Sequence, residues 1–121
     1  MGNLSIILGT TVFFEIENVD SNFFNEKKIF ETLMNEICSI VKATIVKKCE
    51  HIFDNNGTTI VYILAESSLI IHTWPEYNSF TIDLFMCSTS IDVEKINNFI
   101  NEKFKIPEIK YQMIDRTIKK K

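Results

Sequence analysis

The densest group of side chains that could do chemistry lies between residues 66 and 87. A carboxylate (Glu66), a hydroxyl (Ser67), an imidazole (His72) and a thiol (Cys87) are spread through otherwise apolar segments. Polar groups in such segments cost free energy unless they are paired or used. A Cys–His hydrolase is conceivable from these residue types, but no nucleophile elbow or third orienting group accompanies them. From the residues alone, the more common interpretations are a satisfied core histidine, a small apolar cysteine and a Glu-Ser turn.

The segments that carry these residues have the pattern of strands. Runs of β-branched and aromatic residues predict strands over 58–65, 68–74 and 79–87. In the run 79–87, apolar and polar residues alternate, so one face of that strand is expected to be wetter. The Asn-Asn-Gly sequence at 55–57 predicts a turn before the first of the three. Further strands are predicted over residues 4–17 (interrupted at Gly9), 43–49 and 109–117.

Two helices are expected between these strands. Apolar residues recur at helical spacing over 22–41, after helix-capping side chains at 20–22. Cys38 lies among those apolar residues and is expected in the core. The second helix follows Thr89 and Ser90 as candidate caps and ends before Pro107, with an apolar stripe formed by Val93, Ile96, Ile100 and Phe104.

This order of elements predicts an α+β fold. We expect a two-layer sandwich, with an antiparallel sheet and both helices on one face. The other face of the sheet needs cover, and we expect a second subunit to supply it. The length of 121 residues fits a single domain over 1–121.

Composition excludes several classes of protein. With 45% hydrophobic and 24% charged residues, the chain is not disordered. The net charge of −3 argues against a nucleic-acid partner, and Lys119 to Lys121 are expected to form a solvated tail. No apolar run approaches the roughly 20 residues of a membrane span, and the start lacks the features of a signal peptide. Three cysteines without CxxC spacing predict neither a disulfide framework nor a metal site, and favour a reducing, cytoplasmic location.

One stretch of the chain resembles a known family. Residues 65–87 read AESSLIIHTWPEYNSFTIDLFMC, similar to the signature of the short prokaryotic S-adenosylmethionine decarboxylases, which are pyruvoyl enzymes. The family pattern is Glu-Ser-His, a few apolar residues, His-Thr-(Trp or Tyr)-Pro-Glu, then Asp-(apolar)-Phe-Thr-Cys-Gly. The similarity continues in softer form over most of the chain, including His51-Ile-Phe53 before the predicted turn.

The resemblance implies a role for each reactive residue. The bond between Glu66 and Ser67 would be cleaved by the chain itself, giving chains 1–66 and 67–121. Ser67 would become the pyruvoyl group, a covalent cofactor that forms a Schiff base with the substrate and accepts electrons during decarboxylation. His72, and more weakly Thr59 at a position where the family has Ser, would assist this processing. Cys87 would protonate the substrate carbon.

The resemblance also implies a substrate and a partner. Phe53, Trp74 and Glu76 match positions that hold a nucleoside by stacking and by contact with its sugar. The residues alone also allow both aromatics to be core or dimer-interface residues. The small-molecule substrate would be S-adenosylmethionine, and the product an aminopropyl donor for spermidine synthesis. The active protein would be a homodimer, an αββα sandwich with the site at the subunit interface.

Several positions depart from the family pattern and leave alternatives open. Ser68 stands where the family has His, and Met-Cys-Ser at 86–88 replaces Thr-Cys-Gly. Gly-Thr-Thr at 9–11 replaces Gly-x-His. A relative with the same machinery would decarboxylate ornithine or arginine, with Glu76 or Asp83 facing the distal cation. A homologue that never cleaves and has no activity is the other alternative.

Overall fold

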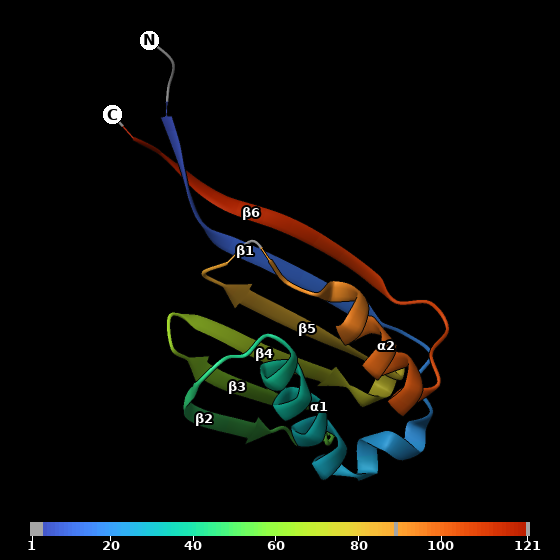
Figure 1. The fold of residues 1–121 in the computed structure, drawn as a ribbon. Coiled ribbons are helices and arrows are strands. Elements are labelled where there is room, and N and C mark those ends of the chain that lie inside the picture. Colours follow the sequence, from blue (N-terminus) through green and yellow to red (C-terminus); the bar gives the residue numbers. More distant parts are fainter. Residues whose placement is uncertain (1–3, 89, 121) are drawn as a thin grey trace.

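Six strands form one antiparallel sheet in the order β2-β3-β4-β5-β1-β6 (Figure 1). The computed structural model describes residues 4–88 and 90–120. Within them the strands are β1 (Leu4–Ile16), β2 (Ile45–Ile52), β3 (Thr58–Leu64), β4 (Ser67–Trp74), β5 (Ser79–Met86) and β6 (Lys110–Lys120). At one end, β1 and β6 extend past the other strands toward the two termini (Figure 1).

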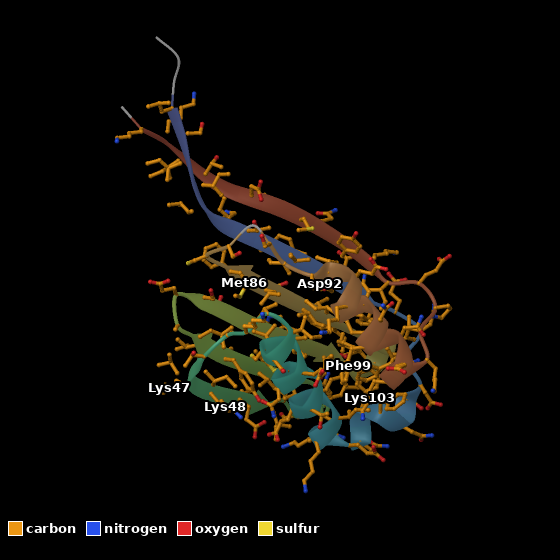
Figure 2. All side chains as sticks on the ribbon, viewed as in Figure 1. Lys47, Lys48, Met86, Asp92, Phe99 and Lys103 are labelled. Atoms are coloured by element: carbon orange, nitrogen blue, oxygen red, sulfur yellow. The ribbon has the colours of Figure 1, made fainter. Side chains whose placement is uncertain are left out.

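Two α-helices, α1 (Lys27–Ile40) and α2 (Val93–Phe104), cover one face of this sheet (Figure 1). Side chains of the helices and the sheet fill the layer between them (Figure 2). The predicted stripe of α2 is buried in full, and Cys38 on α1 is 3% exposed, as expected of a core residue. The prediction of a two-layer α+β fold with an antiparallel sheet is therefore confirmed. The single domain over 1–121 stays a prediction.

The first helix differs from the expected continuous helix over 22–41. A short 3-10 helix, η1 (Ser21–Asn25), comes first and is capped by the Asp20 carboxylate. Glu26, with φ −113° and ψ 85°, then breaks the chain out of helical geometry before α1 begins. The capping residue predicted at this end therefore serves η1, and α1 has no side-chain cap.

Aromatic contacts hold the segment before this break against both helices. Phe23 packs edge-on against Phe104 of α2, with ring centroids 5.0 Å apart. Its neighbour Phe24 stacks on Phe30 of α1, with centroids 5.8 Å apart. These contacts pack η1 against both helices as an element separate from α1. The prediction of a single helix over 22–41 is wrong, since the chain forms η1 and α1 with a non-helical Glu26 between them.

Other boundaries shift for local reasons. The N-cap of α2 is Asp92, whose carboxylate accepts from the Lys95 N–H at 3.0 Å. Ser90 therefore precedes the cap, and the other predicted cap, Thr89, lies outside the described residues. At its far end, α2 stops at Lys105, which has φ 59°, two residues before Pro107.

The edge strands also differ from prediction. β2 begins at Ile45 instead of residue 43, because the Ala43 N–H still donates to the Cys38 carbonyl at the end of α1. β6 continues through Lys119 and Lys120, which pair with β1, so these residues are not a loose tail although their side chains are exposed. The irregularity predicted in the first strand is present as a register shift between Ile7 and Gly9.

Candidate active site

The sheet face opposite the helices carries most of the predicted site. Paired residues of neighbouring strands share a face, and the register aligns His51, Thr59, His72 and Thr81 in one row across β2 to β5. Within this row, Thr59 Oγ1 and His72 Nδ1 are hydrogen bonded at 2.9 Å. Both side chains are half-buried. The structure therefore brings together the two residues predicted to assist processing.

A cavity of about 540 Å³ adjoins this pair. Its volume lies in the range of small-molecule sites. The residues around it are Phe53, Asp54, Asn55, Gly57, Thr59, His72, Thr73, Trp74 and Glu76. All three residues predicted to bind substrate are among them. Phe53 is 50% exposed and Trp74 44%, so neither ring is a core residue and both have surface to offer a planar ligand.

Strand ends position these binding residues. Phe53 follows β2 and closes the turn to β3, with its N–H donating to the Gly57 carbonyl at 2.7 Å. Trp74 is the last residue of β4, on the same face as His72, with ring centroids 6.3 Å apart. Glu76 lies in the 3-10 helix η2 (Pro75–Tyr77), whose first residue is a proline with fixed φ. The cavity thus lies between a β-turn on one side and a strand end on the other.

The predicted cleavage site lies at the opposite end of β4. A two-residue turn, Ala65 and Glu66, joins β3 to β4, and Ser67 begins the new strand. Cys87 follows β5, the neighbour of β4. Its backbone N–H donates to Ser67 Oγ at 3.3 Å, and its thiol contacts the Glu66 carbonyl oxygen. The sheet therefore brings Cys87, 20 positions further along the chain than Ser67, into contact with both residues of the Glu66–Ser67 peptide bond.

The backbone at this bond is strained. Glu66 has φ 63°, in the left-handed region, which costs a non-glycine residue about 1–2 kcal/mol. Sheet pairing on both sides of the turn holds it there, since Leu64 pairs with Ser67. Strained backbone conformations of this kind, held by the surrounding structure, are frequent at functional sites. Cleavage of the following bond would free Glu66 from the conformation.

The candidate site residues therefore form two separate groups within one chain. Ser67 and His72 lie on the same strand, and at about 3.3 Å per residue their separation of five residues is roughly 16 Å. Glu66, Ser67 and Cys87 occupy one end, whereas the cavity residues occupy the other. A hydrogen bond between Ser67 and His72 of the same chain is excluded by this distance.

Burial shifts the pKa values of two side chains, one on the uncovered sheet face and one in the core. Burial raises the pKa of the Asp83 carboxyl, and the neighbouring His72 opposes part of that rise. Asp83 belongs to the same uncovered face, paired with Ile70 one row away from His72. In the core, burial raises the pKa of the Cys38 thiol. A thiol with a raised pKa stays protonated and unreactive, which leaves the exposed Cys49 and Cys87 as the accessible cysteines.

Four residues around the cavity were not predicted as site residues, namely Asp54, Asn55, Gly57 and Thr73. The Asn55 carboxamide donates from Nδ2 to Glu76 Oε2 at 2.7 Å. In the sequence, Asn55 is one of two asparagines in a turn motif, and no signal distinguishes it from its neighbour. Among residues 4–88 and 90–120, no group of three or more His, Cys, Asp or Glu is arranged to hold a metal ion. None of the helices in this described part is long and apolar enough to cross a membrane.

Comparisons with known proteins show what this chain is similar to in sequence and fold. The family model for S-adenosylmethionine decarboxylase matches residues 10–117. An S-adenosylmethionine decarboxylase proenzyme of Archaeoglobus fulgidus is 29% identical over 111 residues, covering 92% of this chain and 99% of the relative. A proenzyme of the same name from Clostridium kluyveri is 32% identical over 111 residues, covering 92% and 88%. The crystal structure of the Aquifex aeolicus adenosylmethionine decarboxylase has a TM-score of 0.76 at 23% identity and covers 91% of both chains.

Proposed function

The chain belongs to the S-adenosylmethionine decarboxylase family, and from that premise we propose that it cleaves itself before Ser67 and then decarboxylates S-adenosylmethionine. The product would be the aminopropyl donor for spermidine synthesis. One observation carries the proposal. The Glu66 carbonyl, the Ser67 hydroxyl and Cys87 converge at the ends of β4 and β5, where the family pattern puts its cleaved bond and its proton donor.

Self-cleavage would use the groups at the turn. The Ser67 hydroxyl attacks the Glu66 carbonyl carbon, the C–N bond breaks, and an ester replaces the amide. The thiol of Cys87 contacts the oxygen on which negative charge develops, and a donor at that point lowers the barrier. Elimination of the ester then releases Glu66 as a carboxylate, and hydrolysis of the remaining dehydro residue releases ammonia and leaves a pyruvoyl. The hydrogen bond from the Cys87 N–H to Ser67 Oγ is consistent with Ser67 as the residue that becomes the pyruvoyl group.

Turnover would use the same end of the site. The pyruvoyl group, once formed, supplies an electron sink for the carbanion left when carbon dioxide departs. Cys87 is held beside Ser67 by its own backbone N–H, at 3.3 Å from Oγ. The exposed Cys87 thiol, which contacts the Glu66 carbonyl oxygen next to Ser67, is placed to deliver a proton to the substrate carbon. Cys87 is therefore our proposed proton donor.

We further propose that a second copy of the chain completes each site. The roughly 16 Å between Ser67 and His72 along β4 leaves the processing residues out of reach of the cleaved bond. Two sheets packed on their uncovered faces, around a two-fold axis across the strands, would place the Glu66–Ser67 bond of one β4 near the His72 end of the other. The Ser67 side chain itself starts on the helix side of its strand, so the backbone of this bond is the part that the partner's His72 would approach. Exposed apolar residues on this face, such as Ile63 at 48%, support such a contact. The result would be the αββα homodimer.

Mixed dimers test this arrangement directly. His72→Ala alone should impair cleavage. Co-expression with Ser67→Ala should restore cleavage of the His72→Ala chain, because one site of the mixed dimer then contains an intact Ser67 and the partner's His72. Differently tagged chains and mass spectrometry would measure the cleaved fraction. Absence of any rescue in isolated mixed dimers, or full activity of a strict monomer, would refute sharing of the site.

The cavity provides the proposed nucleoside site. Phe53 and Trp74 present faces suited to an adenine and a cationic sulfonium, and Glu76 supplies an acceptor for sugar hydroxyls. Stacking a base on an aromatic ring is worth about 1–3 kcal/mol. Phe53→Ala and Trp74→Ala should therefore each raise KM about five- to a hundredfold while leaving self-cleavage intact.

Tyr77→Ala is the matched control for this prediction. Tyr77 is an aromatic residue that is 74% exposed, and it lies one residue beyond Glu76 without lining the cavity. Its removal should leave KM within about twofold of the unmodified protein. Equal effects of Tyr77→Ala and Trp74→Ala would show that general loss of aromatic surface, and not stacking, is being measured.

A side-by-side assay separates the substrates. Release of carbon dioxide from S-adenosylmethionine, ornithine and arginine would be followed on one preparation, with a mass spectrum to establish cleavage. Turnover of S-adenosylmethionine alone is expected. Turnover of ornithine or arginine, with none of S-adenosylmethionine, would replace the proposed substrate, with Glu76 or Asp83 facing the distal cation. An intact chain with no turnover would indicate a homologue without catalytic activity.

The three cysteines are free, which fits the cytoplasmic location we expect.

A further inference from the structure

The Asn55 side chain links two separate segments of the cavity wall. Its Nδ2 donates to Glu76 Oε2 at 2.7 Å, and its Oδ1 accepts from the Gly57 N–H at 2.9 Å. The carboxamide therefore uses one end to hold its own turn and the other to hold η2. The two bonded side chains are 21 residues apart in the sequence.

The sheet does not hold these segments together by itself. Backbone pairing between β3 and β4 ends at Thr59 and His72. Beyond it, the Thr58 N–H donates to Thr73 Oγ1 at 2.8 Å, and Gly57 lies close to the Thr73 carbonyl oxygen. The bond from Asn55 to Glu76 therefore adds a connection beyond the end of the ladder, between two residues that line the cavity. This hydrogen bond joins the side of the cavity that carries Phe53 to the side that carries Trp74 and Glu76.

The turn has space for the carboxamide because residue 57 is a glycine. A Cβ atom at Gly57 would lie 2.9 Å from Asn55 Oδ1 and 3.2 Å from the Thr73 carbonyl oxygen. The first of these distances is shorter than real Cβ contacts allow, so any side chain at position 57 would displace the carboxamide. The turn conformation also depends on Asn56, which has φ 68° and belongs to a residue type that tolerates this region. Asn55 and Asn56 thus have different functions in the same turn.

The hydrogen bond affects how Glu76 can bind. A carboxylate has two oxygens, each with two acceptor positions, and a donor on Oε2 fixes the plane of the group while other acceptor positions remain. Ribose hydroxyls are donors that such a fixed carboxylate can accept from. Ordering the acceptor before the ligand arrives reduces the entropy lost on binding.

We propose that Asn55 is a positioning residue that orients Glu76 toward the sugar hydroxyls of the substrate. This inference rests on the proposed function, since it takes the ligand of the cavity to be a nucleoside. Asn55 does not itself need to contact the substrate. Its loss should weaken substrate binding while leaving self-cleavage and the chemical step unchanged.

The variant Asn55→Asp tests the link selectively. It retains an oxygen for the Gly57 N–H, so the turn is preserved, but it replaces the donor to Glu76 with a second carboxylate. We expect KM to rise about five- to thirtyfold with kcat within about twofold. The matched control is Asn56→Gly, which removes the neighbouring carboxamide while permitting the same positive φ, and which should leave KM unchanged.

A double-mutant cycle shows whether Asn55 acts through Glu76. In a Glu76→Ala background, Asn55→Asp should change kcat/KM by less than about twofold, because there is no carboxylate left to orient. An analogue of S-adenosylmethionine without the 2′ and 3′ hydroxyls should likewise be insensitive to Asn55→Asp. Independent, multiplying effects in the cycle, or equal losses for Asn55→Asp and Asn56→Gly, would overturn the inference.

A binding measurement separates this inference from the proposed function. Calorimetric titration of S-adenosylmethionine into Ser67→Ala protein, with and without Asn55→Asp, measures affinity without requiring cleavage or turnover. Weaker binding with Asn55→Asp supports the inference even if the native protein proves inactive, in which case only the proposed activity fails. Equal affinity for both proteins, or no binding by either, would overturn the role of Asn55.

Discussion

Replacement of Ser67 by alanine should leave a single uncleaved chain of 121 residues without decarboxylase activity. The hydroxyl is the only group on the proposed path that attacks the Glu66 carbonyl, and alanine retains none. The strained turn is expected to persist, because Leu64 and residue 67 pair through backbone groups. Mass spectrometry of the unmodified protein should instead show chains of 66 and 55 residues, the second with a blocked N-terminus.

Ser68→Ala is the control for that experiment. Ser68 carries the same hydroxyl one residue further along β4 and pairs with Phe85. Because successive side chains of a strand point to opposite faces, it does not share the contacts of Ser67 with Cys87. Ser68→Ala should therefore still cleave between Glu66 and Ser67. Products of 67 and 54 residues from the unmodified protein would identify Ser68 as the nucleophile and refute the assignment.

The layers of the fold could be predicted because they follow from periodicity. Alternation along 79–87 corresponds to buried Phe80, Ile82 and Leu84 beside half-buried residues on the uncovered face. The stripe of α2 is buried as its spacing requires. The break at Glu26 could not be predicted in this way, because apolar residues recur at helical spacing on both sides of it.

The candidate site also contains residues that could be predicted from the sequence and residues that could not. Residues such as Cys87 and Trp74 were identified through a family resemblance, and the structure supplies their neighbours. The distance between the two groups of site residues follows from strand geometry once Ser67 and His72 are known to share β4. The role of Asn55 could not be predicted from the sequence, because its hydrogen bond joins residues 21 positions apart and its sequence motif predicts only a turn.

Cys87→Ala should separate cleavage from turnover. Self-cleavage is expected to continue at a reduced rate, since the Ser67 nucleophile is intact and only the contact with the Glu66 carbonyl oxygen is lost. Decarboxylation by the cleaved protein should fall about 10²–10⁴-fold in kcat, the usual effect of removing a general acid. KM should change little, because Cys87 does not line the cavity of Phe53, Trp74 and Glu76.

The control and the alternative outcome make the assignment of Cys87 decisive. Cys49→Ala removes another exposed thiol, on β2 and opposite Val61, and should leave both cleavage and kcat unchanged. Rates are measured on the cleaved fraction alone, so that slow processing is not mistaken for slow chemistry. Near-normal kcat for cleaved Cys87→Ala protein would show that another group donates the proton. Because a second copy would pack on the sheet face opposite the helices, the partner's His72 would then be the first residue to test as the proton donor.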